Sequence, residues 1–96
     1  AEYIRFINEM EIDKPQLALF YKNSDIYEMV LYNNINYELE FPYTIEIFSK
    51  KFEMIRRIQN VDSKIIEFKL NAEENLSIWI RLLKEGKEVM RQSIKL

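Results

Sequence analysis

The sequence predicts an all-β fold, specifically a small antiparallel β-sandwich in the immunoglobulin-like size class. Apolar and polar residues alternate with a period of two along most of the 96 residues, and β-branched and aromatic residues form the apolar half of the pattern. These segments are short, and turn-forming residues separate them at intervals of roughly ten residues. Seven or eight strands around one core are therefore expected.

The N-terminal half contains three predicted strands, at residues 3–7, 17–22 and 27–32. Asp-Lys-Pro at residues 13–15 and Asn-Ser-Asp at residues 23–25 separate them, and both are turn sequences. Residues 33–34, a pair of asparagines, predict a further tight turn because Asn tolerates left-handed backbone angles.

The clearest alternation predicts strands at residues 37–41 and 66–70, each with one wet face. Tyr37, Leu39 and Phe41 fall on one face, with glutamates between them, and residues 66–70 repeat this arrangement. Pro42 then marks the start of a strand at residues 43–48.

The C-terminal residues predict a hairpin. Four aliphatic residues alternate on one face of the first strand: Leu76, Ile78, Ile80 and Leu82. Lys-Glu-Gly-Lys at residues 84–87 forms the turn, and residues 89–96 form the second strand.

Two segments, residues 48–60 and 71–85, also fit helices, which would make the fold α+β. Phe48, Phe52, Ile55 and Ile58 have helical spacing in the first segment, although Phe52, Met54, Arg56 and Ile58 also alternate. A capping-box pattern of Asn71 and Glu74 opens the second segment. The alternation favours strands in both.

Composition predicts one domain over residues 1–96, excised from a longer chain because the first residue is Ala rather than Met. The chain has no Cys or His, so a zinc site or disulfide framework is not expected, and the cellular compartment stays open. A net charge of -2 disfavours nucleic acid as a partner, and no apolar run is long enough to span a bilayer.

The same absences predict that the domain is not an enzyme and binds no cofactor or metal. Ser49 beside Lys50 is the one adjacent nucleophile–base pair, and a polar turn explains it better. The strand glutamates, Glu38, Glu40, Glu46 and Glu67, are expected on solvated sheet faces rather than as paired catalytic carboxylates. A single glycine, Gly86, cannot supply a phosphate-binding loop.

The predicted function is a non-catalytic protein-interaction or structural module within a larger protein or assembly. If Leu76, Ile78, Ile80 and Leu82 face the core, then Trp79, Arg81, Leu83 and Val89 project from the opposite face, and Trp and Arg are enriched in interface hot spots. The partner would be another protein, a neighbouring domain or a second copy joined through edge strands. Coverage of Trp79 by a neighbouring strand is the structural alternative.

The alternative function is a β domain that binds single-stranded nucleic acid or glycan. Lys50, Lys51, Arg56 and Arg57, with Phe48 and Phe52 between them, combine cations with aromatic rings as such proteins do. Edge protection by the same cations is the structural interpretation of this cluster.

Overall fold

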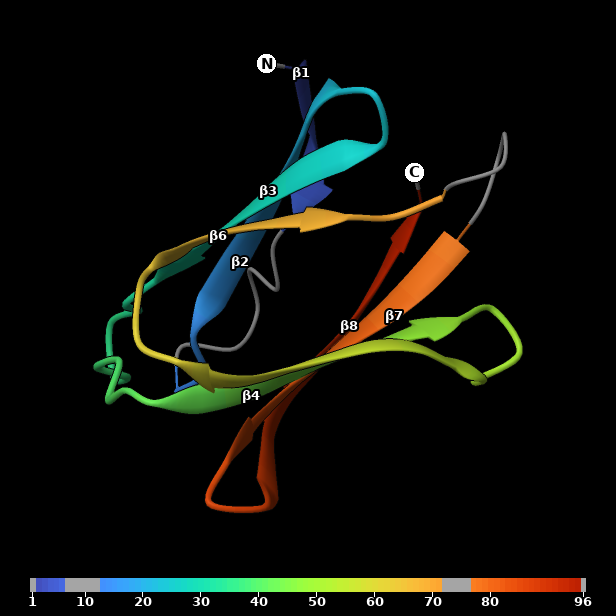
Figure 1. The fold of residues 1–96 in the computed structure, drawn as a ribbon. Helices are drawn as coiled ribbons and strands as arrows, with labels where there is room; N and C mark the ends of the chain where they lie inside the picture. Colours follow the sequence, from blue (N-terminus) through green and yellow to red (C-terminus); the bar gives the residue numbers. More distant parts are fainter. Residues whose placement is uncertain (1, 7–12, 72–76, 96) are drawn as a thin grey trace.

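The computed structural model describes residues 2–6, 13–71 and 77–95, the first of these ranges as backbone only. These residues form eight β-strands, which confirms the all-β prediction (Figure 1). The strands are β1 (Glu2–Phe6), β2 (Gln16–Asn23), β3 (Ile26–Tyr32), β4 (Tyr43–Ser49), β5 (Met54–Val61), β6 (Ile65–Lys69), β7 (Ser77–Lys84) and β8 (Lys87–Lys95).

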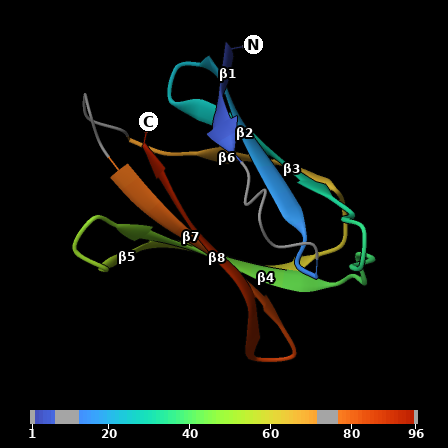
Figure 2. The same cartoon turned by 180° about the vertical axis from the view of Figure 1, so that it is seen from behind.

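The strands form two antiparallel four-stranded sheets that pack as a sandwich. One sheet has the order β1-β2-β3-β6 and the other has the order β5-β4-β7-β8. The chain crosses from one sheet to the other after β3, β5 and β6. Edge strands β1 and β8 contact each other on one side of the sandwich, and β5 and β6 are the edge strands on the other side, as Figures 1 and 2 show from opposite directions.

Alternating apolar residues of both sheets form the core between them. Ile45 and Ile47 of β4 lie opposite Leu82 and Ile80 of β7 in the register, and all four are fully buried. The facing sheet contributes Leu17, Leu19, Met29, Leu31 and Phe68. Complete burial of one such side chain stabilises the fold by about 1.5–3 kcal/mol. The face of each strand that carries these apolar side chains therefore packs against the other sheet.

Two hairpin turns adopt left-handed backbone angles at both central residues, with Asp25 in one and Gly86 in the other as the residue suited to them. Ser24 and Asp25 join β2 to β3 with φ of 46° and 66°, and Glu85 and Gly86 join β7 to β8 with φ of 52° and 81°. Positive φ at both central residues is the type I′ geometry that matches the twist of paired strands. Both predicted turns are confirmed.

Neither of the two alternative helices is present in the described residues, where strands form as the alternation predicts. Residues 48–60 contain the end of β4, a turn and β5, and residues 77–84 form β7. Both segments form strands rather than helices because each has a hydrogen-bonding neighbour in the sheet. Leu76 and the Asn71–Glu74 capping pattern extend into residues 72–76, outside the described part of the chain. The described residues also contain no helix with the length and apolar character that crossing a membrane requires.

The predicted strand at residues 37–41 is wrong, because this segment forms the connection from β3 to β4. Its one ladder contact is an isolated bridge between Asn34 and Tyr37. Leu39 and Phe41 still pack against the core, while Glu38 and Glu40 stay exposed. The alternation thus records a half-buried extended segment that lacks a strand partner.

Tyr43, at the start of β4, anchors this connection. Its buried hydroxyl lies 2.9 Å from the Tyr37 hydroxyl and accepts a hydrogen bond from the Glu40 backbone N–H at 2.8 Å. Burial, together with the Tyr43 hydrogen bond, raises the pKa of the Tyr37 hydroxyl, so Tyr37 is uncharged at neutral pH.

The alternation predicted through Phe52, Met54, Arg56 and Ile58 is interrupted. Phe52 lies in the turn, and the β4–β5 register shifts between Ile47 and Phe48. Met54 therefore lies opposite Phe48 on the outer face, whereas Arg56 and Ile58 lie on the inner side of the strand. A β-bulge reverses the face of the residues that follow it.

We expect Gly86→Ala to reduce the free energy of unfolding by about 1 kcal/mol, because a side chain at φ 81° is strained in L-residues. An added Cβ would meet nothing within 4 Å, so backbone strain is the whole cost. Urea unfolding measures the change. Gly86→Asn is the matched control and should lose less, because Asn tolerates this region; equal losses would contradict the interpretation.

Candidate functional site

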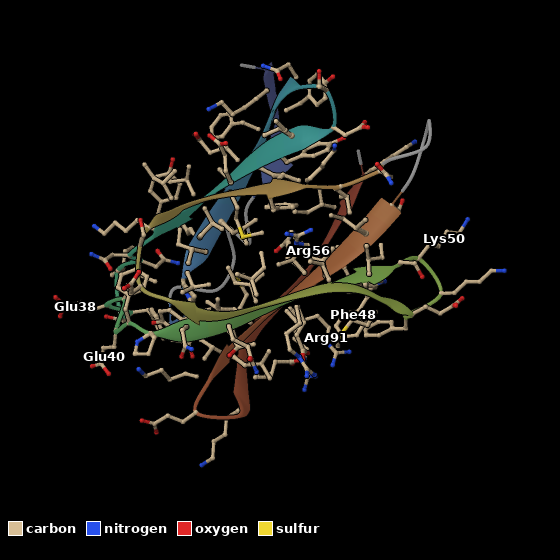
Figure 3. The ribbon with its side chains drawn as sticks, viewed as in Figure 1. Glu38, Glu40, Phe48, Lys50, Arg56 and Arg91 are labelled. Atoms are coloured by element: carbon tan, nitrogen blue, oxygen red, sulfur yellow. The ribbon has the colours of Figure 1, made fainter. Side chains whose placement is uncertain are left out.

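Three aromatic rings gather on the outer face of the β5-β4-β7-β8 sheet. The Phe52 ring centroid lies 5.1 Å from that of Phe48 and 5.4 Å from that of Trp79, within the range of favourable aromatic pairs. The Arg91 guanidinium lies 5.1 Å from the centroid of Phe52, a cation–π distance. These four residues are the aromatic patch, and Figure 3 labels Phe48 and Arg91 within it.

The register of the sheet brings the patch together from three strands and a turn. Phe48 of β4 lies directly opposite Trp79 of β7, and Trp79 lies opposite Ser93 of β8, two residues after Arg91. Phe52 folds over this row from the β4–β5 turn. Phe48 is therefore only 8% exposed on an outward face, while Phe52 remains 42% exposed. The patch is a packed apolar surface with one ring presented to solvent.

The turn holds Phe52 in a left-handed conformation, with φ of 66°. The Phe52 N–H donates to the Ser49 carbonyl at 2.9 Å, and the Ser49 N–H donates to the Glu53 carbonyl at 2.8 Å. The Ser49 hydroxyl also accepts from the backbone N–H groups of Lys51 and Glu53, each at 3.2 Å. An aromatic residue at positive φ is unusual and costs on the order of 1–2 kcal/mol, so these four bonds offset strain that positions the ring.

A row of alternating charges crosses the same face beside the patch. Arg57 donates to Glu46 from Nε and Nη2 at 3.0 and 2.8 Å, and Arg81 donates to the other Glu46 oxygen at 3.1 Å. Arg81 and Arg91 both donate to Oε1 of Glu88, at 2.8–3.0 Å. This charge row links all four strands of the sheet and connects to the patch through Arg91.

Arginine also sets the ionisation of Glu88. Partial burial would raise the pKa of its carboxyl, but hydrogen bonds from Arg91 and Arg81 outweigh that effect and hold the pKa below its usual value. Glu88 thus stays ionised at neutral pH and keeps the Arg91 guanidinium in place over Phe52.

The residues of the predicted partner site divide between two places. Trp79 and Arg81 are half-buried on the outer face, where Trp79 joins the patch and Arg81 joins the charge row. Leu83 is buried at the far end of β7. Val89 packs against the core beyond a register shift in the hairpin, so it does not join the patch.

The four cations of the alternative site also lie in different parts of the structure. Lys50 and Lys51 are exposed in the turn beside Phe52. Arg57 lies on the outer face and is paired with Glu46, while Arg56 lies on the inner side of β5. Consecutive strand residues point to opposite faces, so the two arginines cannot contact one ligand surface together.

The expectation that Glu46 lies on a solvated face is wrong, because Glu46 is only 4% exposed. β4 is an interior strand of its sheet, and Arg57 and Arg81 from its two neighbours cover the carboxylate. Glu67 is exposed on its strand as predicted, whereas Glu38 and Glu40 are exposed in the β3–β4 connection rather than on a sheet. Ser49 bonds to its own turn, and the described residues contain no cluster of three or more potential metal ligands.

The sequence indicates Phe48 and Phe52 only as the aromatic residues of the basic cluster, and it does not indicate Arg91. Phe48 and Phe52 are four residues apart, a spacing that suggests a helix and conceals their contact across a turn. Arg91 could be found only through its register with Arg81. No family model matches the chain, and neither the curated proteins nor the solved structures contain a significant match.

The left-handed backbone at Phe52 predicts an inverted order of two substitutions. Phe52→Gly should be more stable than Phe52→Ala by about 1 kcal/mol, whereas in an ordinary strand position Gly is the weaker residue. Urea unfolding followed by far-UV circular dichroism measures this, because Trp79 fluorescence would respond to the lost ring itself. An Ala variant as stable as the Gly variant would show that the turn does not strain this residue.

The lowered pKa of Glu88 predicts a contribution to stability that depends on pH. Since the folded pKa lies below the unfolded value, the contribution is complete above the unfolded pKa and is lost as pH falls through the folded pKa. Titration of the Glu88 carboxyl by carbon NMR should show an upward pKa shift in Arg91→Gln. Lys95→Gln removes a cation of β8 outside the charge row and should leave the titration unchanged.

Proposed function

We propose that this domain is a non-catalytic interaction module that binds a partner protein through the aromatic patch. The observation that supports this most strongly is Phe52, which a strained turn with four hydrogen bonds holds half-exposed above Trp79 and Phe48. Strain of this kind persists where surrounding structure overdetermines it, and such positions cluster at functional sites.

The composition of the patch matches that of a binding hot spot. Trp and Arg are among the residues most enriched in hot spots, and Trp79 and Arg91 both lie against Phe52. Hydrogen bonds to Glu88 already order the Arg91 side chain, so a partner would pay less conformational entropy to dock against it. The stems of Lys50 and Lys51, which are exposed in the same turn, would form the rim.

Binding of single-stranded nucleic acid is the second candidate, and one observation favours it. Lys50 and Lys51 extend from the same turn as Phe52, so two cations flank an aromatic ring on which a base could stack. Arg56 and Arg57 contribute less to this candidate, because one lies on the inner side of β5 and the other is paired with Glu46.

Photo-crosslinking from position 52 tests the proposal directly. Benzoyl-phenylalanine at Phe52 should crosslink one protein in a lysate of the source organism, because the ring lies at the centre of the patch. The matched control carries it at Ile35, which is 80% exposed in the β3–β4 connection. That connection, marked in Figure 3 by Glu38 and Glu40, lies at the opposite end of the molecule from Lys50.

The purified partner should then change the fluorescence of Trp79, the one tryptophan of the chain. Phe52→Ala is expected to weaken binding by roughly 30-fold, the equivalent of a hot-spot loss of about 2 kcal/mol, while Ile35→Ala leaves it unchanged. Equal crosslinking from both positions would refute the proposal. Oligothymidylate that binds with a steep salt dependence, lost in a Lys50→Glu/Lys51→Glu variant, would establish the second candidate instead.

A further inference from the structure

A cleft opens between edge strands β5 and β6, on the inner side of the sheet that bears the patch. It has a volume of about 400 Å³ and is lined by Ile55, Arg56, Lys69, Leu70 and Asn71. An adjoining hollow of about 270 Å³ is lined by Ile26, Arg56, Glu67, Phe68 and Lys69. Arg56 and Lys69 line both spaces, so each sheet contributes one cation to the open side of the sandwich.

The register explains why a cation lies there. Arg56 lies opposite Ile47, which is fully buried, so the Arg56 side chain starts on the core-facing side of its sheet. β5 is an edge strand, and the space beside it leads out to solvent. In Figure 3 the Arg56 side chain lies in the gap between the ribbons of β5 and β6.

Among the described residues, neither cation of the cleft has an anionic partner. Arg57, Arg81 and Arg91 each bond to a glutamate, but Arg56 and Lys69 form no ion pair or hydrogen bond with any side chain of the described residues. Leu70 and Phe68 belong to the core behind the cleft and are 2% and 4% exposed, whereas Ile55 presents an accessible apolar side chain. Arg56 and Lys69 are both exposed, so an anion can reach them from solvent.

We propose that this cleft binds a carboxylate attached to a small apolar group. The planar fork of Arg56 suits a carboxylate in a bidentate geometry, and Lys69 adds a second positive charge. The apolar group would lie against Ile55, which is 44% exposed. Glu67, which accepts a hydrogen bond from Lys22, places a negative charge at the rim of the adjoining hollow and disfavours a doubly charged ligand.

Two sources share this chemistry, namely the C-terminus of a peptide and a short-chain carboxylic acid. The site is independent of the proposed function, because the patch lies on the other face of the same sheet. Its failure and the failure of the patch are therefore separate results.

NMR titration of the isotopically labelled 96-residue chain tests the site. Hexanoate and a free-acid peptide ending in Leu-Val should cause saturable amide shifts at Ile55, Arg56, Lys69 and Leu70. Hexanol and the C-terminally amidated peptide should cause none, because they lack the charge. The tighter of the two carboxylates identifies the source. Tighter binding of inorganic phosphate than of hexanoate, or shifts spread over the whole surface, would overturn the proposal.

Variants separate a ligand site from general attraction to positive charge. Arg56→Gln should weaken hexanoate binding at least tenfold, and Arg56→Lys, which retains the charge without the fork, should weaken it less. Lys87→Gln removes an exposed cation at the start of β8 and should have no effect. If hexanoate does not bind and Arg56→Gln self-associates, the arginine instead protects the edge strand, and the site is refuted.

Discussion

The burial of β4 and β7 on both faces is the constraint on which the other features of this domain depend. Their inward residues form the centre of the core, and their outward residues cannot be fully solvated because strands flank them on both sides. The outer face therefore contains groups that tolerate partial burial. Glu46 lies beneath two arginines, and Phe48 lies beneath a ring from the adjoining turn. The patch and the charge row are two solutions to the same requirement.

The strand framework could be predicted from the sequence because alternation reports on burial, and burial determines the register of a two-faced strand. Residues 66–70 and 77–84 follow the pattern closely. Alternation wrongly predicts a strand at residues 37–41, where one face is half-buried but no strand lies alongside. Alternation indicates an extended, one-sided segment. Hydrogen-bonding partners depend on the chain topology, which the local pattern does not contain.

The candidate site was harder to predict than the core, because its members meet through pairings between distant parts of the sequence. Trp79 could be placed on the outer face from its neighbours alone. Its contact with Phe52 requires the β4–β7 register, a turn with positive φ and a bulge in β5. Glu46 shows the same limit, since its burial comes from arginines 11 and 35 residues away.

The charge row has a consequence for how this surface can vary. Each inner member of the row serves two neighbours, so reversing the sign at Arg81 would place like charges against both Glu46 and Glu88. A reversal that preserves the pairing would need coordinated replacements on several strands. Sequence drift on this face should therefore be slow or concerted, whereas the turn lysines beside it are free to change one at a time.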